Sequence, residues 1–368
     1  MSSSPPDPTS PPPGLEDELP LAVDDDVSDT DEDDDSAYGS LAGDAISLDS
    51  SMMRFRQENG RSYHGWKPER GYILPSDKEE RERLGESART SRLPFPKRVG
   101  GLTRVFDTAL QHHMFHLTFD GALYHCPAGK EGPPLRRVLD GGTGTGLWAI
   151  EFADAHPETH VVGFDLSPIQ PSFVPPNLTF YIEDLEEDWS SEEPFDFIYC
   201  RMLTGGLTDW PGFMRRAFDN LSPGGWLELT DVVLPALSDD GTLPADSGPA
   251  RWCELAIRAG HILGHSVEEG RRFVHMMRAA GFVRICERVY KWPLSPWPRD
   301  PKYKEIGLWS QHNFCSNIYG LSVALFTRAF GWTLDQLEDF LVDVEKDFKK
   351  RSIHAYWPIY VVYGQKPE

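Results

Sequence analysis

Short apolar runs recur through the middle of the chain, and each is separated from the next by a segment of helical or loop character. Runs of this length are typical of buried strands rather than of helices. Strands that alternate with helical segments predict an α/β fold with a mostly parallel sheet, because crossover connections join parallel strands. The five runs lie at residues 138–140, 160–165, 178–182, 195–200 and 221–229.

The pattern changes after the fifth run. Apolar side chains take a helical spacing, and Gly281 is a suitable residue to end the second of two helices. The segment Trp332–Asp335 has the character of a cap before a further helix. We predict helices over 249–264 and 267–280, a sixth strand over 283–292, helical structure over 300–350 and a last strand over 356–363.

A glycine-rich bend follows the first run. Asp140 ends the strand, Gly141–Gly146 form the bend, and residues 147–155 continue with a helical pattern. Glycine tolerates positive φ and leaves the backbone open to a ligand, while the helix N-terminus favours an anionic group. These features predict a nucleoside-cofactor site. Two cofactors compete, since Gly144–Ala149 also fits the G-x-G-x-x-G/A pattern of NAD-binding folds.

The order of motifs along the sheet favours S-adenosyl-L-methionine (SAM) over NAD. Asp165 ends the second run, near the spacing at which a carboxylate binds ribose hydroxyls in dinucleotide folds. Asp184 follows the third run, and a Leu-Ser-Pro-Gly-Gly turn at 221–225 leads into the fifth. This order resembles that of the class I SAM-dependent methyltransferases.

Further segments carry a narrower resemblance. They are Asp165–Pro171, Val174–Asn177, Asp184–Trp189 and Phe195–Arg201, with flanking segments Glu58–Gly65, Tyr72–Pro75, Trp297–Pro301 and Tyr360–Gly364. Together they resemble the LaeA-like fungal methyltransferases over about residues 56 to 368. Gly141 departs from that group, which more often has an aliphatic residue there, so we expect looser packing behind the loop.

The resemblance implies an α/β, Rossmann-like class I methyltransferase fold. Its sheet is expected to have seven mostly parallel strands, with an antiparallel last strand beside the sixth. The methyltransferase domain would cover 136–368 and follow a helical N-terminal extension at 51–135. A helical insertion at 293–355 would overhang the open ends of the strands, where doubly wound sheets bind ligands, and would serve as a substrate lid.

The resemblance also assigns roles around the cofactor. The glycine loop and Asp140 would hold the amino-acid half of SAM, and Asp165 would accept both ribose hydroxyls. Asp184 and the Leu185 backbone would bind adenine. Arg201 would bind the cofactor carboxylate or an acidic substrate, although a structural ion pair is an equal alternative. The expected cofactor-binding residues are Asp140, Gly142, Thr143, Gly144, Gly146, Asp165, Leu166, Asp184, Leu185 and Arg201.

Residues on the methyl-acceptor side have a weaker signal. Because SAM brings its own electrophile, the protein mainly aligns the acceptor and excludes water, and a base is needed only for a protonated acceptor. His312 is a weak candidate for that base, since histidine titrates near neutral pH. The residues expected near the acceptor are Tyr124, His125, Trp309, His312, Asn313 and Tyr356.

Charge is distributed unevenly along the chain. The net charge is −22, and the first 50 residues contain 15 Asp or Glu but no Lys or Arg. With its many prolines and serines, this segment has too little apolar surface to offset the entropy cost of ordering. We predict a disordered acidic tail over 1–50 that either solubilises the protein or docks to a partner.

Several classes of site and location are disfavoured. No apolar run is long enough to span a bilayer, and the N-terminus does not have the layout of a secretion signal, so a soluble cytoplasmic or nuclear protein is expected. The acidic chain has no basic stripe for direct binding of nucleic acid. Two histidine pairs, His112 with His116 and His261 with His265, have metal-ligand spacing but no recognisable third ligand, so no metal is expected.

Three functions remain open from the sequence. The first is methyl transfer from SAM to a small metabolite of fungal secondary metabolism. The second is a LaeA-like regulator of secondary-metabolite genes that acts through protein partners or on a protein methyl acceptor. The third is a SAM-binding scaffold without turnover.

Overall fold

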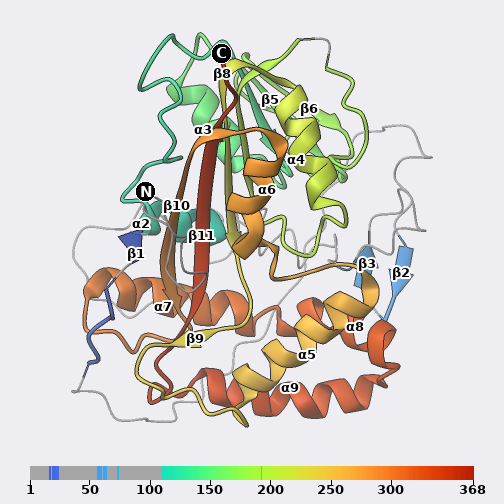
Figure 1. Cartoon of the computed structure of the whole chain (residues 1–368). Helices are drawn as coiled ribbons and strands as arrows, with labels where there is room; N and C mark the ends of the chain where they lie inside the picture. The colour runs from blue at the N-terminus through green and yellow to red at the C-terminus, as the bar shows by residue number, and fades with distance from the viewer. Residues whose placement is uncertain are drawn as a thin grey trace, which may run out of the picture.

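The computed structural model describes residues 16–17, 19–24, 56–59, 61–63, 73, 110–191 and 193–368. Its main feature is a twisted, mostly parallel sheet in the order β1-β10-β11-β8-β7-β4-β5-β6 (Figure 1). The predicted runs form β4 (Arg137–Gly141), β5 (His160–Asp165), β6 (Leu178–Ile182), β7 (Phe195–Arg201), β8 (Leu221–Val232), β10 (Val283–Pro293) and β11 (Ala355–Gln365).

Strand directions confirm the predicted fold class. β4 to β8 are mutually parallel, whereas β11 pairs antiparallel with both β8 and β10. The last strand is thus inserted beside the sixth, as expected for a class I methyltransferase. Two-residue strands β1 (Glu16–Asp17) and β9 (Leu237–Ser238) extend this sheet at β10 and β11.

Apolar side chains of β7 point alternately to the two faces of the sheet, and helices cover both faces. Phe197 and Tyr199 face α3 (Leu147–Ala155) and pack with its residues Trp148 and Phe152. Ile198 and Cys200 belong to the core cluster on the other face, which includes residues of α4 (Trp210–Asp219) and α6 (Phe273–Ala280). The short helix η2 (Glu269–Arg272) leads into α6, which ends at the predicted Gly281 with a φ of 103°.

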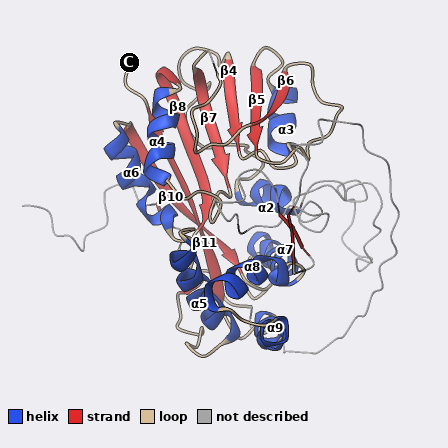
Figure 2. Cartoon of the chain, turned by 90° about the vertical axis from the view of Figure 1, so that its right-hand side faces the viewer, coloured by secondary structure: helices blue, strands red, loops and turns tan. Residues whose placement is uncertain are grey.

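A helical layer covers one end of the sheet and has a core of its own. Figure 2 shows α5 (Gly248–Leu263), α7 (Pro301–Cys315), α8 (Ile318–Phe330) and α9 (Leu334–Phe348) gathered there, with α2 (Leu110–Thr118) between this layer and the sheet. Local signals set the starts of two of these helices. Asp300 caps α7 before Pro301, and Thr333 forms a capping box with Gln336 at the predicted start of α9.

The segment before the sheet combines a hairpin with a helix. β2 (Arg56–Glu58) and β3 (Arg61–Tyr63) pair antiparallel, and this hairpin contacts α8 through a 2.7 Å ion pair between Glu58 and Arg328. A helical extension was predicted over residues 51–135. In the described part of that range, the structure has this hairpin and one helix, α2. The helix predicted to begin near Ser76 lies outside the described residues.

A buried carboxylate joins the segment before β4 to the sheet. Glu228 on β8 is fully buried, and its carboxylate oxygens accept the backbone N–H of His125 at 2.9 and 3.0 Å and that of Cys126 at 2.6 Å. Burial raises the pKa of Glu228 to about 7. The interaction joins a loop to a strand that is 102 or 103 residues away in the sequence, so no local motif indicated it.

Part of the acidic N-terminal segment lies along β10, where β1 pairs, and along the loop and helix that follow β10. Val23 bridges to Pro298, Arg299 N–H donates to Ala22 at 2.8 Å, and Asp24 pairs with Lys304. Disorder was predicted over residues 1–50. Apart from residues 16–17 and 19–24, this range lies outside the described part of the chain. No helix in the described part of the chain is long and apolar enough to cross a membrane.

Candidate functional site

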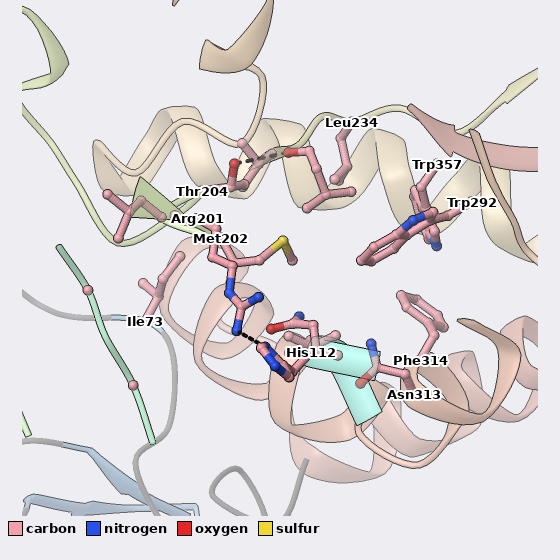
Figure 3. A pocket seen from close by; sticks show the side chains of 18 of the residues that line it. Ile73, His112, Arg201, Met202, Thr204, Leu234, Trp292, Asn313, Phe314 and Trp357 are labelled. Carbon is pink, nitrogen blue, oxygen red and sulfur yellow. Dashed lines mark hydrogen bonds between the residues drawn. The ribbon is translucent and has the colours of Figure 1, made fainter. Parts of the chain in front are cut away.

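A cavity of about 270 Å³ lies where the carboxyl ends of the parallel strands meet the helical layer. The loops after β4, β5 and β7 form one part of its wall, and residues of α2, α5, α7, α8, β10 and β11 form most of the rest. Figure 3 shows side chains from these distant segments pointing into one space. This is the position at which open parallel sheets bind ligands.

The glycine loop after β4 lines one side of the cavity. Gly142, Gly144 and Gly146 have φ values of 73°, 57° and 82°, which side-chain-bearing residues rarely adopt. The backbone N–H groups of Gly142 and Thr143 both donate to the Phe164 carbonyl at 2.9 Å, which ties the loop to β5. A Cβ on Gly144 would meet no atom within 4 Å, so this residue has open space beside it.

Two carboxylates organise this loop. Thr143 donates its hydroxyl to Asp140 at 2.6 Å, and Gly144 donates its N–H to Asp165 at 2.7 Å. The other oxygen of Asp165 accepts the Ser167 N–H at 2.9 Å. Burial raises the pKa of Asp140 and of Asp165 to about 6 in each case. Gly142, Thr143, Gly144 and Asp165 therefore lie together at the cavity wall, with Asp140 directly behind them.

The expected adenine-binding residues lie farther along the sheet edge. Asp184 is buried, and one carboxylate oxygen accepts the Glu186 N–H at 2.9 Å, which is a local turn contact. Asp184, Leu185 and Leu166 are not among the described residues that line this cavity, and Gly146 stands just behind its wall at the start of α3. Their roles toward a nucleoside stay predictions.

Gly141 does not loosen the packing behind the loop, contrary to expectation. A Cβ built there would lie 2.7 Å from the sulfur of Cys200 and 3.3 Å from a methyl group of Leu185. These two buried side chains fill the space that an aliphatic residue would need. The glycine is therefore matched by its neighbours, and a larger residue would overpack this position.

Arg201 ends β7 and projects into the cavity. Its guanidinium donates to Nδ1 of His112 at 2.9 Å (Figure 3). It also lies 5.2 Å from the ring centre of Phe115. The expected alternative, a structural ion pair, is not observed for Arg201 among the described residues. The opposite ring nitrogen of His112 lies 2.7 Å from the carboxylate of Glu151 on α3.

His112, His116 and Glu151 form a cluster that bears on the metal prediction. Nε2 of each histidine lies within 2.8 Å of the same Glu151 oxygen, so the structure supplies the third ligand type that the sequence did not show. Arg201 can only donate, however, so Nδ1 of His112 must accept and Nε2 must carry the proton. A metal would need that Nε2 lone pair, and the hydrogen-bond pattern therefore favours a protonated network over a metal site.

The electrostatics of this network agree with that assignment. Burial lowers the pKa of His112 to about 4, so the imidazole is neutral near pH 7. The hydrogen bond from His112 is the main cause that lowers the pKa of Glu151 to about 2. A neutral imidazole thus separates the Arg201 cation from the Glu151 anion and fixes α2 against α3.

Most residues expected near the acceptor lie outside the cavity. Asn313 lines it, but His312 is exposed and does not, because Ser310, Asn313 and Phe314 occupy the cavity face of α7. The other residues have structural partners. Tyr124 donates to the Ala128 carbonyl, His125 stacks on Tyr290, Trp309 packs against His113, and Tyr356 donates to Asp239.

Several cavity residues were not identified from the sequence. They come from α2, α5, α7, β10 and β11, which are far apart along the chain, so no local motif marks them. The sequence carries a signal for one cavity residue. Ile73, which is buried in the wall, lies in the flanking segment Tyr72–Pro75 that carries the family resemblance. The missed polar and aromatic residues include Gln111, His112, Trp252, Trp292, Phe314 and Trp357.

Comparison with known proteins agrees with this geometry. Residues 110–287 match the family model described as a methyltransferase domain. The chain is 35% identical to methyltransferase pytC of Aspergillus terreus over 87% of this chain and 91% of that protein. It is 39% identical to probable methyltransferase tdiE of Emericella nidulans over 70% of this chain and 80% of that protein.

A regulator is also among the relatives. The secondary metabolism regulator LAE1 of Cochliobolus heterostrophus is 32% identical over 84% of this chain and 94% of its own length. Identity of this level across nearly whole proteins, together with the class I strand order, establishes the family. The chain belongs to the LaeA-like fungal SAM-dependent methyltransferases.

Proposed function

We propose that this methyltransferase acts on a small metabolite of fungal secondary metabolism, which it holds in the same cavity as the cofactor. The observation that carries the proposal is the composition of that cavity. One part is a polar backbone loop with Asp165, and the other is a wall of aromatic and aliphatic side chains. Such a cavity suits a small apolar acceptor beside a nucleoside.

The cofactor-binding roles belong to the same proposal. Asp165 would accept the two ribose hydroxyls, since its carboxylate has acceptor positions beyond those used by Gly144 and Ser167. Arg201 would bind the carboxylate of the amino-acid half, and Asp184 with Leu185 would bind adenine. SAM supplies a methyl group activated by its sulfonium. The chain's own contribution is to align the acceptor with that methyl group and to exclude water.

A regulatory role is the second candidate, and similarity to LAE1 supports it. In that case the methyl acceptor or the partner would be a protein. Residues 19–24 of the acidic segment lie against β10 and the loop before α7, so a docking role for the rest of that segment would act near this edge.

Incubation with labelled SAM and a fungal extract tests the proposal. We expect label in the small-molecule fraction, because the acceptor site is a cavity of about 270 Å³ with a wall of buried aromatic side chains. Label confined to proteins would favour the regulatory candidate, and no label above that of heat-inactivated protein would contradict turnover. An extract from a culture that produces secondary metabolites is the appropriate source of acceptors.

Cofactor affinity should depend on pH. The pKa of Asp165 is raised to about 6, so its carboxylate is mostly ionised at pH 7 and mostly protonated at pH 5. Only the ionised form offers both oxygens to the ribose, so SAM affinity should fall about tenfold from pH 7 to pH 5. Calorimetry at each pH measures this, with Asp165→Asn as the non-titrating control. An equally steep fall in that variant would assign the effect to another group, such as Asp140.

A further inference from the structure

Aromatic rings wall the part of the cavity that α5, α7, β10 and β11 form. We call Trp252, Trp292, Phe314 and Trp357 the aromatic wall. Phe314 lies 4.9 Å from Trp252 and 5.5 Å from Trp357 between ring centres, so three of the rings form one contiguous surface. Figure 3 shows Trp292, Trp357 and Phe314 grouped around the same space. All four side chains are at most 6% exposed.

Two of the three indole N–H groups of the aromatic wall have partners within the protein. The indole N–H of Trp252 donates to Ser322 at 2.8 Å, and that of Trp292 donates to Thr118 at 2.7 Å. These donors are therefore used within the protein, and ring surface remains for the cavity. Flat aromatic ligands pack on such surfaces by stacking or edge-to-face contact.

Two amide groups in the cavity have atoms without a partner. Nε2 of Gln111 and Oδ1 of Asn313 are both buried, and neither forms a hydrogen bond in the described part of the structure. Gln111 is only 6% exposed and lies on α2, a helix that contacts α7. Buried polar atoms are normally paired, so one unpaired donor and one unpaired acceptor point to a ligand with the complementary groups.

Charge limits the ligand further. Of the described residues that line the cavity, Asp165 and Arg201 are the ionised ones at neutral pH, and the proposed function assigns both to the cofactor. His112 is neutral because burial lowers its pKa to about 4. An ionised acceptor molecule would thus have no counter-ion near the aromatic wall, and its burial would be costly.

We propose that the methyl acceptor is a flat, uncharged aromatic compound that donates a hydrogen bond to Asn313 and accepts one from Gln111. A neutral phenol with a ring carbonyl substituent has this chemistry. Transfer to its oxygen would form the O–CH3 bond as the S–CH3 bond of SAM breaks; S-adenosylhomocysteine would be the leaving group, and the phenolic proton would pass to water. The inference rests on the proposed function, since it specifies the acceptor of the same site. It adds that Gln111 and Asn313 determine which acceptors bind.

Calorimetry with defined probes tests the acceptor class on protein saturated with S-adenosylhomocysteine. The probes are 4-hydroxyacetophenone, acetophenone without the donor, 4-ethylphenol without the carbonyl, and the charged 4-hydroxybenzoate. We expect 4-hydroxyacetophenone to bind at least about tenfold more tightly than each of the other three, because each leaves an amide atom or a charge unpaired. Equal affinities, or no saturable binding of 4-hydroxyacetophenone, would overturn the proposal.

Variants assign the two contacts. Asn313→Leu should bring 4-hydroxyacetophenone and acetophenone to within about twofold of each other, and Gln111→Leu should do the same for 4-hydroxyacetophenone and 4-ethylphenol. His312→Ala, on the exposed face of the same helix as Asn313, is the matched control and should keep the wild-type preferences. Preferences that persist in both leucine variants would overturn the assignment.

The outcomes separate this inference from the proposed function. Affinity for S-adenosylhomocysteine and the melting temperature report whether each variant is folded. If an extract metabolite is labelled while the phenolic probes do not bind, the acceptor class is wrong and the methyltransferase of small metabolites stands. If label enters proteins alone, the proposed function fails whatever the probes do.

Discussion

Replacing Asp165 with alanine should weaken SAM binding by about a hundredfold or more. The carboxylate is expected to accept two ribose hydroxyls, and hydrogen bonds to a charged group contribute about 1.5–3 kcal/mol each. The substitution also removes the acceptor for the Gly144 N–H, which lies 2.7 Å from Asp165, so the glycine loop would lose an anchor as well as a ligand contact. Calorimetric titration with SAM measures the loss directly.

The control for this variant is Asp154→Ala. Asp154 is exposed on α3 and does not line the cavity. Its replacement by alanine removes the same charge as Asp165→Ala does. We expect wild-type affinity in that protein. An affinity in Asp165→Ala within about threefold of wild type would be incompatible with the ribose assignment, since one charged hydrogen bond alone accounts for more.

Gly146→Ala should lower the free energy of unfolding by about 2–5 kcal/mol, which is the sum of backbone strain and overpacking. Gly146 has a φ of 82°, and a Cβ there would lie 2.4 Å from the ring of Phe180. Phe180 also packs against Gly163, where a Cβ would approach the same ring to the same distance, so the ring has little room to move. Chemical denaturation of the purified variant measures the change.

Gly144→Ala is the matched comparison within the same loop. Its φ is 57°, but a Cβ would meet nothing within 4 Å, so only the strain of about 1–2 kcal/mol applies. The added methyl group would occupy open space beside the cavity. We therefore expect Gly144→Ala to weaken SAM binding clearly, while its free energy of unfolding falls less than that of Gly146→Ala. A Gly146→Ala protein as stable as Gly144→Ala would show that Phe180 does not restrain the loop.

The strands and the glycine loop were predictable because their signals are local. Each strand is a short apolar run, and Asp140 through Gly146 combine strand end, bend and helix start within one contiguous segment. The resemblance carried by these segments implied the class I topology, and the structure confirms it. The same reasoning located the caps at Gly281 and Thr333, where backbone conformation depends on one or two residues.

The acceptor side was not predictable in the same way. Gln111, Trp252, Asn313 and Trp357 meet only after α2, α5, α7 and β11 pack together, and each alone is an ordinary polar or apolar position in its element. His312 was predicted to lie near the acceptor because its neighbours in the sequence are polar. In a helix, however, consecutive residues point to different faces, and His312 points away from the cavity while Asn313 lines it. Glu151 was missed for the same reason, since it approaches His112 and His116 from another helix.

The contact between residues 19–24 and the β10 side of the sheet has a consequence for shortened versions of the protein. A chain that begins at residue 51 would remove β1, which pairs in parallel with Arg288 and Val289 on β10. An uncovered outer strand offers its backbone N–H and C=O groups to other copies, and such strands promote aggregation. We therefore expect a chain shortened in this way to self-associate more readily than the full chain.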